Sequence, residues 1–438
     1  MAAADGYVAT FERLDGSRPP RLRDLRHAAI ARFAALGFPT TALEEWKYTD
    51  VTALAEVPFR AGATPAAPTA DRRRLDELRL ATSIELVFID GCYAPALSAH
   101  EGIPRGVTVT SLSRAMIEHP DLVSAHLGQY ANYQDHAFTA LNTAFADDGA
   151  FVHLSRGAVF RTPIHLLFLS TAAREPTMAC PRTLIVAGEA SEATVIESYA
   201  SADDATSFTN AVSEIVVGPH ASVTHYKLQQ EGARAFHIAT IEARQGTGSR
   251  FASHAISLGA LLSRTDINTT MEAEGTTCTF DGLYLAGGDQ HVDHHTSIDH
   301  RRPHGTSREL YKGILDGRAT GVFNGKVFVR PRAQKSDAQQ MNKNLLLSDD
   351  AVINTKPQLE IFADDVKCSH GATIGRLSDD ALFYLRARGI DAPTARQVLI
   401  YAFANELIER IGVAPLRERL GRALRRRLPG LLQAGDTA

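Results

Sequence analysis

Residues 223–230 read VTHYKLQQ, and this run is the first of ten short β-forming runs that extend to residue 355. The others are HIATIEAR (237–244), FASHAISL (251–258), TDINTTME (265–272), CTFDGLYL (278–285), VDHHTSID (292–299), ELYKGIL (309–315), GVFNGKVFV (321–329), MNKNLLL (341–347) and VINT (352–355). Gly, Asp, Asn or Ser residues separate them, and the apolar spacing typical of helices is absent. This stretch therefore predicts a mainly β fold.

The spacing of these runs is nearly constant. Every second run is shifted by 28 to 31 residues, with anchors at Val223, Phe251, Phe280, Leu310 and Met341. The interleaved anchors Ile238, Ile267, His295, Phe323 and Ile353 repeat at nearly the same step. A fixed period in this range is typical of stacked repeats, and two strands per step predict the coils of a parallel β-helix.

A large antiparallel sandwich is the alternative fold, because strands at this spacing could also form hairpins. The turn pair Asn324–Gly325 lies inside a run and not at a hairpin tip, which favours the solenoid.

The flanking segments read as helical. Leu22, Leu25, Ala29, Phe33 and Leu36 recur at helical spacing before Gly37, a natural stop. Residues 58–70 are rich in Pro, Ala and Gly and predict a linker, and IELVFI at 84–89 predicts a buried strand. We expect an N-terminal helical domain over 1–150, a β-helix core over 151–375 and a C-terminal helical domain over 376–438.

The C-terminal segment has clear helix signals. Ser378 precedes two acidic residues that suit the first turn of a helix, and Pro393 opens a second helix that Gly412 ends. That second helix carries a broad apolar stripe at Val398, Leu399, Ala402, Phe403, Leu407, Ile408 and Ile411. Two interpretations are open: the helices cap the open end of the solenoid, or one exposed face docks a partner.

Composition excludes several classes of protein. The 438 residues carry a formal net charge of −4, without the basic excess typical of nucleic-acid binders. No apolar run approaches the roughly 20 residues that span a bilayer, and the first residues lack the pattern of a secretory signal. Cys92, Cys180, Cys278 and Cys368 are widely separated, which predicts reduced thiols. We expect a cytoplasmic protein that binds neither nucleic acid nor membrane.

The signatures of common enzymes are missing. GVFNGKVF (321–328) lacks the glycine spacing of a phosphate loop and has no hydroxyl residue after Lys326. No GxGxxG sequence opens a helix, and no GxSxG elbow occurs. ATPase, dehydrogenase and hydrolase activities therefore have no motif in this chain.

The densest group of metal-ligand side chains is HVDHHTSIDHRRPHG at 291–305. It contains His291, Asp293, His294, His295, Asp299, His300 and His304. On a strand, Asp293 and His295 share a face while His294 points away, so one site cannot gather all five histidines. A metal site of a stand-alone metalloenzyme and a hydrogen-bonded edge or partner interface both fit this pattern.

The second candidate site is DDVKCSHGAT at 364–373. If this segment is a strand, Cys368 and His370 present a thiol and an imidazole on one face. Both groups suit iron, but two ligands make only half of a tetrahedral site. Other coils or a second chain would have to complete it, and a buried thiol beside a surface histidine is the simpler alternative.

The run from Tyr311 to Ile390, which contains GVFNGKVFVRPRAQKSDAQQMNKNLLL and DDVKCSHGAT, closely resembles the shared core of the SufB/SufD family. The segment HTSIDH (295–300) also matches, and EEWKYTD (44–50) resembles the N-terminal signature of the SufD branch. Ser336 stands where the family often has Thr. SufB is the alternative branch, but its chains tend to be longer and usually lack this Cys-x-His pattern.

The resemblance implies a right-handed parallel β-helix with helical flanks. It also implies a non-catalytic scaffold for iron–sulfur cluster assembly, in a complex with SufB and the ATPase SufC. His370 is similar to the histidine that faces SufB where the nascent cluster forms, which makes it a candidate iron ligand, and Cys368 matches the neighbouring cysteine. The C-terminal helices resemble the SufC docking region. The cluster would be transient, with no tightly bound cofactor in the isolated chain, which could also pair with itself.

Overall fold

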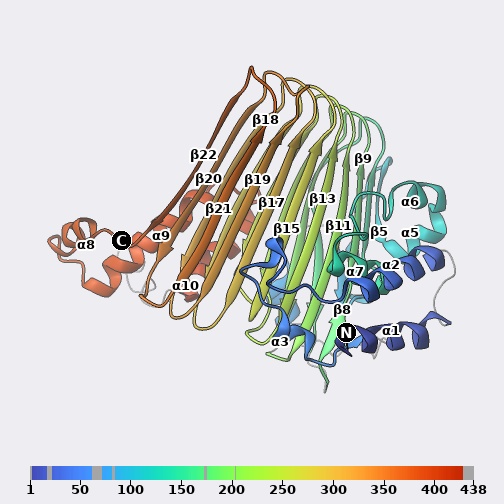
Figure 1. Cartoon of the computed structure of the whole chain (residues 1–438), viewed down its shortest axis with the longest axis horizontal. Helices are drawn as coiled ribbons and strands as arrows, with labels where there is room; N and C mark the ends of the chain where they lie inside the picture. Colours follow the sequence, from blue (N-terminus) through green and yellow to red (C-terminus); the bar gives the residue numbers. More distant parts are fainter. Residues whose placement is uncertain are drawn as a thin grey trace.

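The computed structural model describes residues 2–16, 22–61, 72–80, 84–171, 175–202 and 204–427. From residue 182 to residue 375 the chain alternates between two parallel sheets, one strand to each in turn, so that the sheets face each other as the two walls of a solenoid (Figure 1). The predicted parallel β-helix is confirmed as a mainly β solenoid with helices at both ends of the chain.

The first sheet contains, in spatial order, β21 (Val352–Ile361), β19 (Thr320–Val329), β17 (His291–His300), β15 (Leu262–Met271), β13 (Phe236–Gln245), β11 (Ser207–Val217), β9 (Arg182–Ala187), β6 (Ala150–Leu154) and β5 (Val107–Ser111), with β8 (Thr177–Ala179) beside β11 and β1 (Arg60–Ala61) beside β8. The second contains β22 (Lys367–Gly375), β20 (Asp337–Leu346), β18 (Thr306–Leu315), β16 (Thr277–Ala286), β14 (Arg250–Ser257), β12 (Ser222–Gln230), β10 (Glu192–Ser201), β7 (Val159–Ser170), β2 (Ile84–Ile89) and β3 (Cys92–Tyr93), with β4 (Ala99–His100) beside β2.

The register shows where the predicted period holds and where it drifts. Val223 pairs with Phe251 and Leu310 with Met341, as the spacing predicts. Phe251, however, pairs with Cys278 and not with Phe280. The strands keep a nearly constant length while the turns between them vary. The spacing of the sequence anchors therefore differs by a residue or two from the spacing of the residues that pair.

The core lies between the two sheets. Side chains alternate between the interior and the outer faces, and the inward ones form one cluster that runs through the coils, including Val223, Ile241, Phe280, Tyr311 and Phe323. Strands of parallel sheets covered on both faces are buried on both sides, and β11 to β19 are buried along most of their length.

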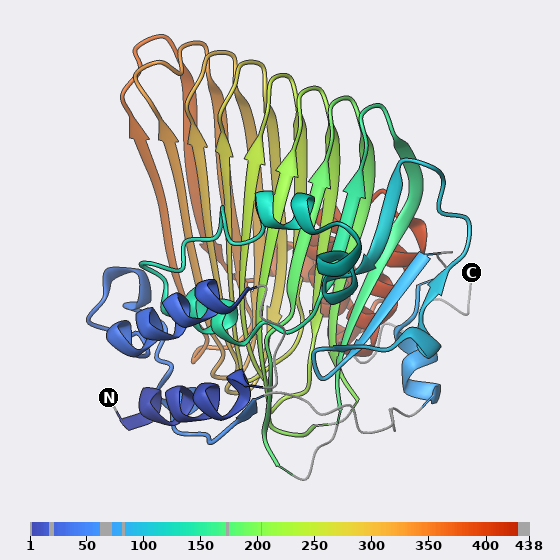
Figure 2. The same ribbon diagram turned by 90° about the vertical axis from the view of Figure 1, so that its right-hand side faces the viewer.

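N-terminal helices cover the outer face of the first sheet (Figure 2). They are α1 (Ala2–Asp15), α2 (Arg23–Leu36), η2 (Glu44–Trp46), α3 (Thr52–Ala55), α5 (Leu112–Glu118), α6 (Pro120–His126) and α7 (Ala137–Phe145). The predicted stop of α2 is confirmed, because Gly37 has a φ of 66° and its N–H donates to the carbonyl of Phe33. The predicted buried strand is β2, which extends the second sheet by pairing with β7. The short helices α4 (Arg72–Leu78) and η3 (Pro95–Leu97) lie near β2.

The C-terminal helices α9 (Ala392–Ile408) and α10 (Ala414–Arg427) cover the outer face of the second sheet. The helix α8 (Asp379–Arg386) precedes them, has no buried residue and contacts α9. Ile400, Leu407 and Ile411 pack on Ile256, Leu283 and other outward side chains of β12 to β20. Of the two open interpretations, capping of the solenoid end does not describe α9 and α10, because Leu407, Ile408 and Ile411 pack on a sheet face.

Three further expectations concern single segments. The predicted linker over 58–70 lies outside the described residues from residue 62 onward, while Arg60–Ala61 pairs with β8. The four cysteines, all among the described residues, form no disulfide, as expected. Among the described residues, no helix is long and apolar enough to cross a membrane.

Candidate functional site

Cys368 and His370 lie on β22, the last strand of the second sheet. Parallel pairing places Cys368 beside Ala338 and His370 beside Gln340. Ala338 and Gln340 are both buried at inward-facing positions. Because neighbouring strands in register share a face, Cys368 and His370 occupy the corresponding inward-facing positions of the final coil.

This final coil is open to solvent. Within the described part of the chain, no strand pairs with the outer edge of β21 or of β22. Burial falls sharply here: β17 is mostly buried, whereas β22 is mostly exposed. Cys368 is half-buried against the core and His370 is exposed. Unpaired strand edges are templates for pairing with another chain, so the two candidate ligands border a surface suited to a partner.

Cys368 and His370 alone supply too few ligands for a metal site. Burial raises the pKa of the Cys368 thiol, and the Asp337 carboxylate adds to this effect. A metal ion would therefore have to displace a proton to bind the sulfur. Across the described residues, no group of three or more His, Cys, Asp or Glu side chains could hold a metal ion. The remaining ligands of a cluster at this end would have to come from another molecule.

The interior behind His370 is unusually polar. Gln340 donates to the carboxylate of Glu309 at 2.7 Å, and burial raises the pKa of Glu309 to about 7. Farther along, the Tyr284 hydroxyl donates to Asn344 at 2.6 Å, and the His294 ring lies between Tyr284 and Tyr311. Sequence reasoning missed this polar interior, because only the register brings side chains 30 residues apart together.

The histidine-rich segment forms β17 and the turn that follows, and its side chains separate. His294 points into the core, whereas Asp293 and His295 share the outer face with a 3.1 Å contact, as alternation predicts. His300 is buried beside Ser307, and His304 lies in the turn with a φ of 61°. The metal-site interpretation loses its support, because no group of these side chains within the described residues could hold a metal ion.

Asp293 and His295 instead belong to a network with the N-terminal segment. Thr49 donates to Asp293 at 2.6 Å, and Arg264 donates to the same carboxylate at 3.1 Å. Burial would raise the pKa of Asp293, but His295 and Arg264 outweigh it and hold that pKa well below its ordinary value. Burial would lower the pKa of His295, yet Asp293 and Glu45 together raise it.

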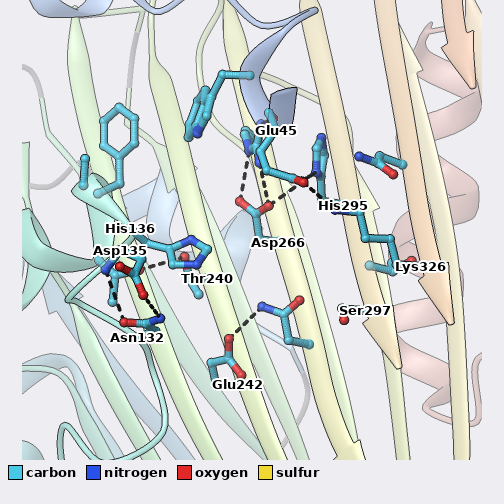
Figure 3. Close-up of a pocket in the computed structure, with 18 of the residues that line it drawn as sticks. Glu45, Asn132, Asp135, His136, Thr240, Glu242, Asp266, His295, Ser297 and Lys326 are labelled. Carbon is cyan, nitrogen blue, oxygen red and sulfur yellow. Dashed lines mark hydrogen bonds and ion pairs between the residues drawn. The ribbon is translucent and has the colours of Figure 1, made fainter. Parts of the chain in front are cut away.

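A hollow of about 690 Å³ lies beside this network, on the outer face of β13, β15, β17 and β19. Figure 3 shows Glu45, Asp266 and His295 meeting at one end and Asn132, Asp135 and His136 at the other. Glu45 pairs with Lys326, and Asp266 pairs with Arg264 at 2.8 Å. Acidic and basic side chains therefore pair where the N-terminal segment meets the solenoid. The EEWKYTD segment is attached to the solenoid through these pairs.

The helix α8 carries two exposed aromatic side chains, Phe383 at 74% and Tyr384 at 56% exposure. In the predicted stripe of α9, by contrast, Leu407 and Ile408 are buried and Phe403 is half-buried. Leu407 and Ile408 are therefore covered and not accessible to a partner. Docking on the rest of the predicted stripe stays a prediction. Phe383 and Tyr384 thus place two exposed aromatic side chains next to each other in the sequence of α8.

Comparisons with known proteins agree with this architecture. Residues 168–403 match the family described as "SUF system FeS cluster assembly, SufBD core domain", and residues 4–166 match "SufBD protein N-terminal region". The chain is 38% identical over 415 residues to the iron–sulfur cluster assembly SufBD family protein slr0076 of Synechocystis, covering 93% of this chain and 91% of that one. It is 35% identical over 398 residues to the iron–sulfur cluster assembly protein SufD of Escherichia coli, covering 90% of each. It is 31% identical over 407 residues to the chloroplastic protein ABCI7 of Arabidopsis thaliana, covering 91% and 84%.

Proposed function

Because the chain belongs to the SufBD family of iron–sulfur cluster assembly proteins, we propose that it is the SufD-type scaffold subunit of a SUF complex and that the nascent cluster forms at its open solenoid end. The observation that carries this proposal is the placement of Cys368 and His370 at inward-facing positions of an unpaired final coil. Two ligands from this chain and the others from a partner would complete a cluster site.

The partner at this end is a SufB subunit. The free edges of β21 and β22 offer backbone donors and acceptors on both sheets at once, so a second solenoid of similar cross-section could continue both. Pairing would also cover the exposed His370. In the absence of SufB, the same edges support pairing of two copies of this chain.

The partner at the C-terminal helices is the ATPase SufC. Phe383 and Tyr384 on α8 supply an exposed aromatic surface outside the packed face of α9. Aromatic side chains are enriched among the residues that dominate binding energy. ATP hydrolysis belongs to SufC, since this chain has no phosphate loop. The purified chain alone should show no saturable ATP hydrolysis.

His370 is the proposed iron ligand. An exposed imidazole nitrogen is a good ligand for iron. Co-expression of this chain with the SufB and SufC of the same organism tests the proposal. We expect one complex that carries iron and acid-labile sulfide. Failure of the three proteins to associate would refute the scaffold role.

A further inference from the structure

A second hollow, of about 440 Å³, lies between α4, the end of β12 and α10. Its lining joins residues from the N-terminal and C-terminal parts of the chain. The side chains that line it are Arg74, Asp76, Glu77, Leu78, Arg79, Gln230, Arg419, Arg422, Ala423, Arg426 and Arg427. Six arginines face two carboxylates, so the lining carries a formal surplus of four positive charges.

Arg419 is the most confined of these cations. It is 8% exposed, and it donates to the carbonyl of Leu78 and, at 2.7 Å, to the side-chain oxygen of Gln230. Both acceptors are neutral. Burial, and then the like charges of Arg74 and Arg422, lower the pKa of Arg419 to about 10 against a smaller opposing effect of Glu85, which lies beyond ion-pair distance. A buried charge without an ion-pair partner is costly. The folded chain is therefore less stable when no anion occupies the hollow.

The two carboxylates of the lining are already engaged. Glu77 pairs with Arg74 at 3.2 Å, and Asp76 lies 3.6 Å from Arg79. Arg422 has only a 3.9 Å contact to Glu418. Arg419 and Arg426 have no carboxylate within ion-pair distance in the described part of the chain. The surplus of four charges therefore belongs to Arg419, Arg422, Arg426 and Arg427.

We propose that this hollow binds a small phosphate-bearing anion. Guanidinium groups present planar pairs of donors that match phosphate oxygens, and several of them around one concave space can hold one anion together. The chain as a whole is acidic, with a net charge of −4, so the positive potential is a local feature. A confined hollow suits a small molecule better than a nucleic acid, which requires an extended basic face.

An anion bound here would also join α4 to α10. A ligand that binds only the folded state raises its stability in proportion to the logarithm of ligand concentration. Binding and thermal stabilisation should therefore rise together, which provides two independent measurements.

The test is calorimetric titration of the full-length chain with inorganic pyrophosphate, with ATP, citrate and a short single-stranded oligonucleotide as further probes. The test variant carries Arg422→Gln and Arg426→Gln, both exposed positions that should not disturb folding. The matched control is Arg425→Gln, on the same helix but outside the lining. Circular dichroism confirms that each variant is folded.

We expect saturable binding of pyrophosphate and ATP with a rising melting temperature, weakened about tenfold or more in the double variant, because hydrogen bonds to charged groups are strong. The control should bind within about twofold of the unmodified chain. Absence of saturable pyrophosphate and ATP binding, equal loss in the control, or preference for citrate or the oligonucleotide would overturn the proposal. If the double variant unfolds, titration of the unmodified chain and of each single variant decides the question in the same way.

Discussion

The guanidinium carbon of Arg264 lies 3.8 Å from the centre of the Trp46 indole ring. This stacking joins η2 to β15, although the two residues are separated by more than 200 positions in sequence. Arg264 is 3% exposed and also pairs with Asp266 and Asp293. The N-terminal segment is therefore bound to the solenoid by a buried ionic network whose outer layer is the only tryptophan of the chain.

Removal of one hydroxyl should weaken this attachment. Thr49→Val keeps the shape of the side chain but removes the donor to the buried carboxylate of Asp293. We expect a loss of about 1–3 kcal/mol in the free energy of unfolding, because a buried charge loses a hydrogen bond. Urea unfolding followed by the fluorescence of Trp46 measures it.

Thr52→Val is the control, since Thr52 is exposed and bonds only to the nearby Asp50. Its effect should stay within about 0.5 kcal/mol. Equal stability of Thr49→Val and the unmodified chain would show that the network does not bind the segment.

Glu309 should make stability depend on pH. Burial raises its folded-state pKa from 4.5 to about 7, so the folded protein retains a proton that the unfolded chain releases between these values. This contribution is present at low pH and is lost as pH rises through about 7. Glu309→Gln, which still accepts from Gln340, should be more stable than the unmodified chain at pH 8, by up to about 3 kcal/mol, and similar to it at pH 5.

Urea unfolding at both pH values measures this difference. Glu192→Gln, at an exposed position of β10, is the control and should show no such dependence. A Glu309→Gln chain that is less stable at pH 8 would contradict the prediction, because it would mean that the ionised carboxylate is favoured in the core.

The α8 surface should carry SufC binding. Phe383→Ala combined with Tyr384→Ala removes two exposed aromatic side chains, so the fold should change little. We expect SufC affinity to fall about tenfold or more, measured by surface plasmon resonance. Phe362→Ala is the matched control, because Phe362 is 56% exposed but precedes β22, whereas α8 follows it. Undiminished affinity in the double variant would remove α8 from the interface.

The sequence predicts the coils well but not what covers them. A period near 29 residues identifies two strands per coil, and alternation correctly separates His294 from Asp293 and His295. The apolar stripe of α9 predicts burial without saying what buries it, so Leu407 and Ile408 packed on a sheet where an end cap or partner was expected. The handedness of the solenoid stays a prediction.

Only part of the candidate site could be predicted, because the sequence shows local alternation but not which distant residues meet. Cys368 and His370 are two residues apart, and a strand places such residues on one face. The contact between Glu309 and Gln340 depends instead on register across a turn of variable length, which no local pattern specifies. The attachment of Thr49 to Asp293 spans 244 positions and likewise left no local signal beyond the quoted EEWKYTD motif.

The central claim is that His370 holds the nascent cluster, and Cys368 serves as its internal comparison. His370 is exposed at the end of the solenoid, so His370→Ala should leave folding and complex formation intact. Cys368→Ala should have a milder effect on cluster content, because burial raises the pKa of its thiol and disfavours the thiolate that binds metal.

The decisive measurement is the iron and acid-labile sulfide content of complexes purified from cells that co-express SufB, SufC and each variant, compared at equal complex yield. The account predicts that His370→Ala abolishes or strongly reduces both iron and sulfide, whereas Cys368→Ala retains much of each. Full cluster content in the His370→Ala complex would contradict the account.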